Sequence, residues 1–316
     1  MSRYIVRRLL AFVPTLLAVT LVIGLLIDLI PGDPVELLLG GTELSRISVD
    51  QKRHELGLDR PVLVRLVEWT VNALRGNLGK SYFMNRPVSA VIAERYGVTI
   101  SLAIYALVLA TVVGVCAGVV ASIHQGGLID WAVTASALVW LSVPDFWLAL
   151  TLIFFFGVQL KWFPISGYAS LIKDGPIQFL KHMLLPVISL GLGECGVIAR
   201  YTRTSMLEVL RMDYITTARA KGLPERPVLL RHALKNALIP IITALGIAFG
   251  GLLGGATVVE LAFTMSGVGR LILDSVRRRD YPVVQGGLLV VAVSFLLVNL
   301  LVDLLYAWAD PRIRYE

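Results

Sequence analysis

The chain has 316 residues, of which 56% are hydrophobic and 16% are charged, and its mean hydropathy is +0.76. Soluble domains usually carry about 25% charged residues, so this composition excludes an ordinary soluble protein and indicates a chain that crosses a lipid bilayer. The net charge of +7 is typical of membrane proteins with basic cytoplasmic loops, and the lack of a basic patch interleaved with aromatic residues argues against nucleic-acid binding.

Six apolar stretches are long enough to span a bilayer, which needs roughly 20 mostly apolar residues in a helix. They run at about 9–30, 98–122, 131–158, 183–204, 236–262 and 284–308. The first follows a basic N-terminus, but it is too long for a signal-peptide core and no small-residue cleavage site follows it. We therefore expect a retained helix, and an all-α membrane protein with six transmembrane helices.

Prolines and glycines add detail to these stretches. Pro144 in the third stretch and Pro186 in the fourth predict kinks. Gly250 and Gly254 in the fifth form a small-xxx-small pattern, which lets another helix approach closely. That helix could belong to the same subunit or to a second one.

A segment of mixed charge separates the first stretch from the second. It covers residues 31–97 and contains turn signals such as Pro-Gly-Asp-Pro at 31–34. We predict a small folded extracytoplasmic insertion here. The expected organisation is an N-terminal tail and first helix at 1–30, the insertion at 31–97, and a five-helix core at 98–316 with a cytoplasmic loop at about 205–236.

Basic residues predict the orientation, because Lys and Arg collect in short cytoplasmic loops. Three basic segments fall on one side of a six-span chain: the N-terminus, the loop from about 200 to 235, and the C-terminal tail. Their members are Arg3, Arg7, Arg8, Arg200, Arg203, Arg211, Arg219, Lys221, Arg226, Arg231, Lys235, Arg312 and Arg314. Both termini are therefore predicted to be cytoplasmic. The outer loop at about 263–283 conflicts with this rule, since it carries Arg270, Arg277, Arg278 and Arg279.

The loop between the fourth and fifth stretches contains the run DYITTARAKGLPERPVLLRHALKNALIP, from Asp213 to Pro240. Its first part favours a helix that ends before Gly222, a residue suited to the position after a helix C-cap. Pro224 can open the next helix. A short helix held just outside the membrane can dock into a groove on a soluble partner. From composition alone, a solvated basic loop is an equally good interpretation.

This run resembles the coupling loop, or EAA loop, of binding-protein-dependent ABC importers, and most closely that of the dipeptide/oligopeptide/nickel permease family. Ala218 and Gly222 stand at the small-residue and glycine positions of the loop. Thr216 and Thr217 replace its Glu and first Ala, and Lys235 replaces its Pro, departures that match the peptide-permease branch. Further ordered blocks resemble the family: RYIVRRLLAFVPTLLAVTLVIGLLIDLIPGDP, GNLGKSYFMNRPVSAVIAER, VVELAFTMSGVGRLILDSVRRRDYPVVQG and LVNLLVDLLYAWADPRIRYE.

The resemblance implies the type I ABC importer permease fold in a prokaryotic cytoplasmic membrane, and a non-enzymatic role in the import of dipeptides or oligopeptides. It implies four kinds of partner: a homologous second permease, two ATP-binding subunits, an extracytoplasmic substrate-binding protein and membrane lipid. ATP and Mg²⁺ would bind the ATP-binding subunits, and this chain would hold no cofactor. The expected coupling residues are Asp213, Thr216, Thr217, Ala218, Arg219, Lys221, Gly222, Leu223, His232 and Asn236. The alternatives are import of nickel or glutathione, an ion-driven secondary transporter, or a membrane scaffold.

Charged residues inside apolar stretches are candidates for a translocation path, because they are costly in a membrane and face protein or water. Asp145 and Glu194 could line such a path and meet the ammonium end of a peptide, or they could pair with polar groups on neighbouring helices. Glu260 and Asp303 lie nearer the ends of their stretches, and we expect exposure at the membrane interface to explain both.

Other motifs give weak signals. The segment Gly76–Ser81 resembles a phosphate-binding loop, but Leu74 stands where that pattern needs a glycine, so we expect no nucleotide site. Cys116 and Cys195 lie in apolar stretches without CxxC spacing and predict neither a disulfide nor a metal site. The sequence contains no evident catalytic triad, carboxylate pair or metal-ligand cluster, which argues against an enzyme.

Overall fold

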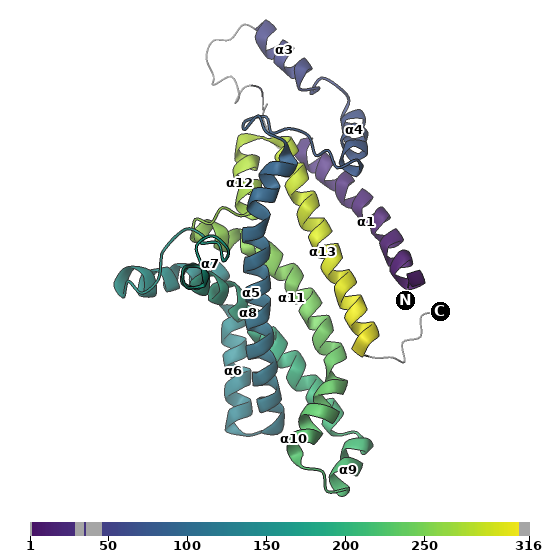
Figure 1. Ribbon diagram of the computed structural model, residues 1–316, viewed down its shortest axis with the longest axis vertical. Helices are drawn as coiled ribbons and strands as arrows, with labels where there is room; N and C mark the ends of the chain where they lie inside the picture. Colours follow the sequence, from purple (N-terminus) through teal and green to yellow (C-terminus); the bar gives the residue numbers. More distant parts are fainter. Residues whose placement is uncertain (1, 29–34, 36–45, 310–316) are drawn as a thin grey trace. The chain divides into compact units, whose positions relative to one another are not determined.

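A computed structural model describes residues 2–28, 35 and 46–309, and this part of the chain is mostly helical (Figure 1). The turn signal at 31–34 and the tail arginines Arg312 and Arg314 lie outside the described residues. The chain divides into two compact units. Unit 1 is Met1–Gly97 with Ser266–Leu296, and unit 2 is Val98–Met265 with Leu297–Glu316.

Unit 1 contains α1, α3, α4, α12 and the first parts of two long helices, α5 and α13. The bounds are α1 Ser2–Asp28, α3 Arg46–Glu55, α4 Val62–Leu74, α5 Val88–Ile123, α12 Val268–Arg278 and α13 Tyr281–Ala309. The helices α3 and α4 fall within the predicted insertion. The proposed domain boundaries at 30 and 97 stay a prediction.

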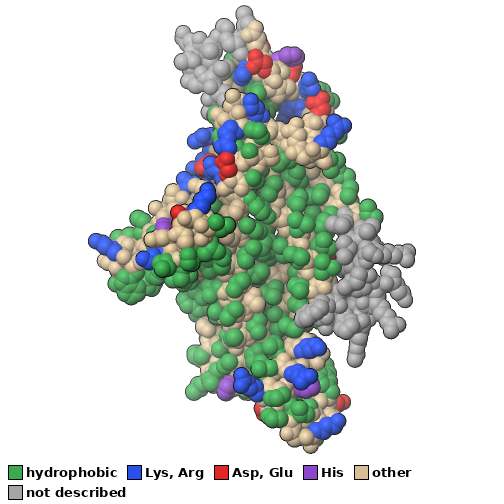
Figure 2. Space-filling model, viewed as in Figure 1, with side chains coloured by type: hydrophobic (Ala, Val, Ile, Leu, Met, Phe, Trp, Pro, Cys, Tyr) green, Lys and Arg blue, Asp and Glu red, His purple; other side chains and the backbone are tan. Residues whose placement is uncertain are grey.

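Unit 2 contains the remaining helices. They are α6 Leu128–Ser142, α7 Asp145–Leu152, the π-helix η1 Ile153–Gln159, α8 Pro176–Leu210, α9 Asp213–Ala220, α10 Glu225–Pro227, the π-helix η2 Val228–Ala233 and α11 Leu234–Ala262. The last three form one continuous helical rod from Glu225 to Ala262. Hydrophobic side chains cover the long helices, and basic side chains gather at the end of unit 2 that carries α9 and α10 (Figure 2).

Four described helices are long and apolar enough to cross a membrane: α5, α8, the rod from Glu225 to Ala262, and α13. The third predicted stretch forms α6 and the α7–η1 helix, which meet at an angle of 95° and would count as a fifth span if taken together. The apolar part of α1, Leu10–Leu25, is shorter. The described residues therefore give four or five candidate spans, and the six-span arrangement stays a prediction.

The kink predicted at Pro144 is a full break between two helices. Val143 has an extended backbone (φ −88°, ψ 118°), as does Pro144 (φ −65°, ψ 138°). Proline disfavours the helical region for the residue before it, which explains why α6 ends at Ser142. At Pro186, by contrast, α8 continues without a break, and the Ser189 hydroxyl donates a hydrogen bond to the Pro186 carbonyl at 2.9 Å.

The arginine-rich stretch that is predicted to lie outside the membrane forms α12 in unit 1. Arg277 and Arg278 are exposed in its last turn, and Arg279 ends the helix in a left-handed conformation (φ 57°). The macrodipole of a helix favours cations at its C-terminus. The helix end therefore favours these arginines whichever side of a membrane they occupy.

Asp280 ties the segment after α4 to the start of α13. It is 1% exposed, and its carboxylate accepts hydrogen bonds from the Ser81 hydroxyl at 2.5 Å and the Tyr82 N–H at 3.1 Å. Ser81 ends the segment that resembles a phosphate-binding loop. Because its hydroxyl faces a carboxylate, a phosphate group at this position would meet negative charge.

Close helix packing in unit 2 depends on glycines. A methyl group on Gly118 of α5 would lie 2.6 Å from the Ala199 carbonyl oxygen of α8, and one on Gly196 of α8 would lie 2.7 Å from the Ala137 carbonyl oxygen of α6. Real side-chain carbons do not approach a backbone so closely. The helix α8 is therefore in backbone contact with α5 on one side and α6 on another.

The expected exposure of Glu260 is wrong. Its side chain lies in α11 and is 0% exposed, and one carboxylate oxygen accepts a hydrogen bond from the Thr99 hydroxyl of α5 at 2.5 Å. Burial of a carboxylate requires such partners, since an unsatisfied charge is costly in a low-dielectric interior. The position of Glu260 near the end of an apolar stretch suggested contact with solvent. In the structure, the Thr99 hydroxyl of another helix contacts the carboxylate instead.

Candidate functional site

The predicted coupling segment forms a helix, a turn and a second helix at one end of unit 2. The helix α9 ends as expected, with Gly222 in the left-handed region (φ +77°). The Gly222 N–H bonds to the Arg219 carbonyl at 2.9 Å and the Leu223 N–H to the Ala218 carbonyl at 3.3 Å. This pair of bonds is the Schellman motif, which satisfies the last carbonyls of a helix. Pro224 then precedes the first residue of α10, Glu225, as the sequence predicts.

An apolar cluster holds α9 against the rest of unit 2. Ile215 is fully buried and Ala218 is 9% exposed, and both pack with residues of α8 and of the rod. The cluster comprises Met206, Ile215, Ala218, Val228, Ala233, Ala237 and Ile241. The small residue Ala218 therefore faces inward and sets how closely α9 approaches its own unit.

Two polar contacts add to this anchor. The Asn236 amide donates to the Tyr214 hydroxyl at 3.1 Å and to the His232 carbonyl at 2.8 Å. Arg219 forms two hydrogen bonds with Glu225 across the turn, at 2.8 and 3.2 Å. Both of these side chains are exposed, and exposed ion pairs contribute little to stability. Together, the contacts orient α9 relative to the first turns of the rod.

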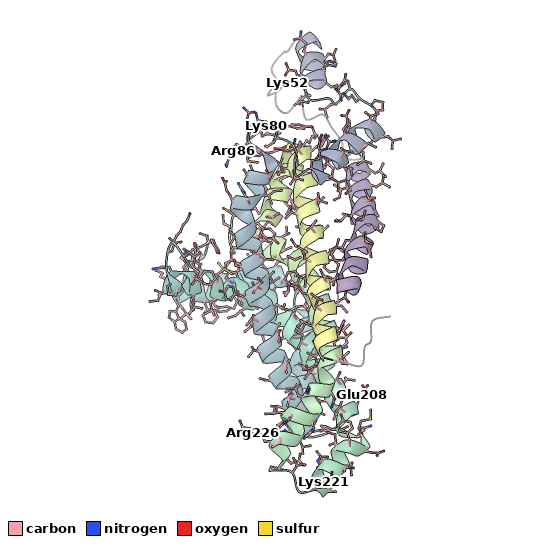
Figure 3. All side chains as sticks on the ribbon, turned by 45° about the vertical axis from the view of Figure 1, so that its right-hand side comes forward. Lys52, Lys80, Arg86, Glu208, Lys221 and Arg226 are labelled. Atoms are coloured by element: carbon pink, nitrogen blue, oxygen red, sulfur yellow. The ribbon has the colours of Figure 1, made fainter. Side chains whose placement is uncertain are left out.

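The remaining predicted coupling residues form an outward face. They are exposed around α9 and its turn: Asp213, Thr216, Thr217, Arg219, Lys221, Gly222 and Leu223. Lys221 projects from the tip of unit 2, with Arg226 close by on the next helix (Figure 3). Of the other predicted residues, Asn236 is exposed, His232 is half-buried and Ala218 is buried. A short helix with a buried face and an exposed polar face is suited to docking.

Asp145 and Glu194 converge on one face of α11. An ideal Cβ on Gly255 would lie 3.0 Å from an Asp145 carboxylate oxygen, and one on Gly251 would lie 3.0 Å from a Glu194 carboxylate oxygen. Gly251 and Gly255 are four residues apart, so their positions are neighbours on a helix. Both acids are half-buried, and the structure gives neither carboxylate a hydrogen bond or ion pair among the described residues. The absence of side chains at these glycines leaves room for the two acids.

A strip of small and apolar residues on α11 is exposed in the described part of the chain. Ile247, Gly251, Gly254, Val258 and Leu261 are exposed and recur at helical spacing along one face. No atom lies within 4 Å of the position that a Cβ on Gly254 would take. Packing within the described part of the chain therefore does not use Gly254, the second glycine of the pattern noted in the sequence.

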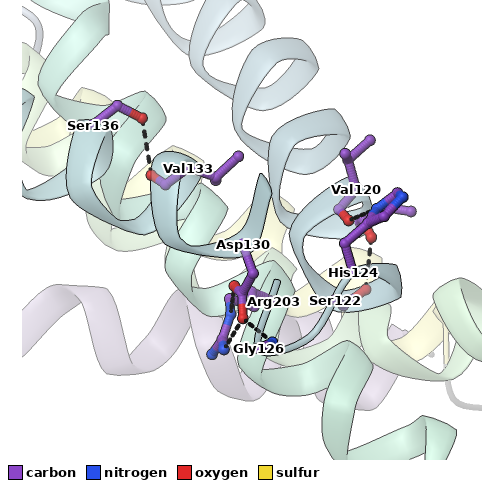
Figure 4. Close-up of polar contacts among 9 residues, drawn as sticks. Val120, Ser122, His124, Gly126, Asp130, Val133, Ser136 and Arg203 are labelled. Carbon is purple, nitrogen blue, oxygen red and sulfur yellow. Dashed lines mark hydrogen bonds and ion pairs between the residues drawn. The ribbon is translucent and has the colours of Figure 1, made fainter. Parts of the chain in front are cut away.

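The sequence analysis missed an ion pair between Asp130 of α6 and Arg203 of α8 (Figure 4). The Arg203 Nε and Nη2 atoms donate to the two Asp130 carboxylate oxygens at 2.5 and 2.7 Å, and the Gly126 N–H donates at 2.9 Å. Asp130 is 5% exposed. The sequence held one indication of this pair, because both residues lie at the predicted cytoplasmic ends of their apolar stretches. The 73 residues between them hid the pairing.

Comparison with known proteins places this arrangement in a family. Residues 113–315 match the family described as "Binding-protein-dependent transport system inner membrane component", and residues 1–103 match its N-terminal companion. The chain belongs to this family. The two matches together cover nearly the whole chain. This agrees with the blocks of sequence that resemble the family in the same order along the chain.

Three relatives of this inner membrane component illustrate the range. A putative peptide transport system permease protein of Brucella abortus is 43% identical, with all of both chains covered. A di/tripeptide transport system permease protein of Pseudomonas aeruginosa is 41% identical and a glutathione transport system permease protein of Escherichia coli is 40% identical, also over both whole chains.

The fold has a counterpart among solved structures. A chain of the MetNI methionine ABC transporter, in an inward-facing conformation, matches with a TM-score of 0.55 and 17% identity. The match covers 70% of this chain and 97% of that one. This inner membrane component therefore has the fold of type I ABC importer permeases.

Proposed function

We propose that the chain is the membrane permease subunit of an ATP-driven importer of dipeptides or oligopeptides. The observation that carries the proposal is α9, a short helix anchored by a buried face and closed by Gly222, with a polar face left exposed. Family membership implies ATPase and substrate-binding partners. The exposed face of α9 would dock into an ATP-binding subunit, and ATP and Mg²⁺ would bind that subunit, so this chain is not itself the enzyme.

The proposed arrangement has six spans, with both termini and α9 in the cytoplasm of a prokaryote. In addition to α5, α8, α11 and α13, the spans would be α1 and the broken α6–α7 pair. A homologous second permease would cover the strip on α11 that includes Gly251 and Gly254, because small residues let helices approach closely in a membrane. The translocation path would run along that contact. Substrate would arrive from an extracytoplasmic binding protein.

Asp145 and Glu194 would line this path. They lie beside the exposed strip of α11, against two glycines that are four residues apart on that helix. An acidic pair that has no cationic partner among the residues the structure describes suits the ammonium group of a peptide. ATP binding would move the ATP-binding subunits, and α9 would move with them. This movement would switch the path between an inward-facing and an outward-facing state, each stabilised by its own set of contacts.

Neutralising the acids tests the path. We expect Asp145→Asn and Glu194→Gln each to reduce uptake of a dipeptide with a free amino end by about 10-fold, the value of one charged hydrogen bond. Uptake of the same dipeptide with an acetylated amino end should be equal in both variants and the wild type. Glu208→Gln is the matched control, because Glu208 is an exposed acid on the same helix as Glu194 (Figure 3). If all variants take up the free dipeptide as well as the wild type does, Asp145 and Glu194 do not contact the substrate and their role is structural.

Glutathione is the second candidate substrate, favoured by the glutathione transport system permease that is 40% identical. Both candidates are tested by one experiment. The chain is reconstituted with the other subunits of its transport system, and uptake of radiolabelled dipeptides, oligopeptides and glutathione is compared in the presence and absence of ATP. A chain that neither recruits an ATPase nor supports ATP-dependent uptake is not an importer permease.

A further inference from the structure

The Asp130–Arg203 ion pair lies between the coupling segment and the acidic pair. Arg203 is on α8, seven residues before the end of that helix at Leu210, or about 10 Å along its axis. The next helix is α9. Asp130 is in the first turn of α6, and the far end of α6 leads through the break at Pro144 into Asp145. The ion pair therefore joins the part of α8 that precedes α9 to the first turn of α6, and α6 leads into α7, the helix that begins at Asp145.

Between these two ends, α6 and α8 touch through their backbones. The ideal Cβ of Gly196 lies 2.7 Å from the Ala137 carbonyl oxygen and 3.2 Å from the Ala137 Cα. A contact of this kind has no long side chains that could change rotamer, so a shift of one helix is passed directly to the other. The α5 side of the hairpin also packs closely against α8, at Gly118 beside Ala199 and Thr202. These packing contacts set how closely the helices approach, and a directional attachment at the start of α6 would keep its axis aligned with that of α8 during movement.

The ion pair has the properties of such an attachment. Both hydrogen bonds run from the planar guanidinium to the two oxygens of one carboxylate, a geometry that restrains direction as well as distance. Gly126, in the turn between α5 and α6, holds the same carboxylate by its N–H. The turn, the first turn of α6 and α8 thus meet at Asp130 (Figure 4).

We infer that Asp130 and Arg203 are positioning residues for transport, which clamp the α5–α6 hairpin to α8 so that a displacement of α9 reaches Asp145 as one rigid movement. The inference rests on the proposed function. Without the clamp, ATP-driven movement of α9 would still move α8. The start of α6 would follow less closely, because only the packing contacts at Gly118 and Gly196 would remain, and ATP would be hydrolysed without a matching change at the path.

The test measures the ratio of ATP hydrolysed to substrate imported by the complete transporter in proteoliposomes. Asp130→Asn keeps the size of the side chain and removes its charge. We expect its ratio to rise about 5-fold or more, the lower end of usual coupling effects between sites. Arg203→Lys keeps the charge but cannot donate two parallel hydrogen bonds, so its ratio should rise by a smaller factor. Loss of stability alone would reduce the amount of assembled complex and leave the ratio per complex unchanged.

Arg200→Gln is the matched control. Arg200 is on the same helix three residues before Arg203, is exposed, and forms no ion pair among the described residues. Its ratio should equal that of the wild type. If the Asp130→Asn chain does not assemble into a transporter, the ratio of ATP hydrolysed to substrate imported in Arg203→Lys tests the clamp by itself. Wild-type ratios in both assembled variants would overturn the clamp while the importer stands. A wild-type complex without coupled uptake would overturn the proposed function, and the clamp with it.

Discussion

Gly222→Arg is expected to abolish ATP-driven uptake while the chain still folds and enters the membrane. Gly222 has φ +77°, and no described atom lies within 4 Å of the position of an added Cβ, so an added side chain starts in open space. The left-handed conformation costs roughly 1–2 kcal/mol for a residue other than glycine. The long cation would project from the tip of the turn into the surface that docks with the ATP-binding subunit. We expect uptake to fall at least about 30-fold, equivalent to 2 kcal/mol at an interface hot spot.

Gly222→Ala separates the two causes of that loss. Alanine has the same backbone strain as arginine at this position, but it adds only a methyl group that meets nothing. It should retain most of the uptake and most of the ATPase that co-purifies with the chain. If alanine and arginine reduce uptake equally, the cause is the turn itself. If Gly222→Arg transports normally, α9 is not the coupling helix.

The coupling segment could be predicted from sequence because its signals are local. Gly222 and Pro224 define the end of one helix and the start of the next through their own backbone preferences, and the structure confirms both. The location of the break at Pro144 follows in the same way. Its size does not, since an apolar stretch has the same composition whether it crosses a membrane straight or turns through 95°. The direction after the break depends on packing of α7 against α8 and α11.

Residues whose roles depend on tertiary packing could not be predicted. Glu260 is buried because Thr99, on another helix, satisfies it. Asp130 and Arg203 are in different stretches, and only the close approach of α6 to α8 brings them together. Either residue alone resembles a charge at the end of a span, which is the most common position for such a charge. The sequence therefore predicts which positions are charged, and the helix packing determines which charges are paired.

The packing of α5 on α8 gives the second large effect. Gly118→Ala should destabilise the chain, because the added methyl would lie 2.6 Å from both the Ala199 carbonyl oxygen and the Thr202 Cβ. Forcing an extra carbon into a well-packed interior typically costs about 1–3 kcal/mol, against a gain of up to about 1 kcal/mol from replacing glycine in a helix. The net loss should lower the Tm in detergent by several degrees, at about 2–4 °C per kcal/mol. Gly118→Leu should prevent assembly.

Gly97→Ala in the same helix is the matched control and should change the Tm in the opposite direction. Gly97 also lies within α5, but an added methyl there would meet no atom within 4 Å. Only the gain in helix propensity remains, so we expect a Tm equal to or slightly above that of the wild type. If Gly→Ala lowers the Tm at position 118 and does not lower it at position 97, the close contact of α5 with α8 lies at Gly118. A Gly118→Ala chain as stable as Gly97→Ala would show that α5 and α8 are not in backbone contact, and the rigid assembly on which the Asp130–Arg203 clamp acts would then lose one of its members.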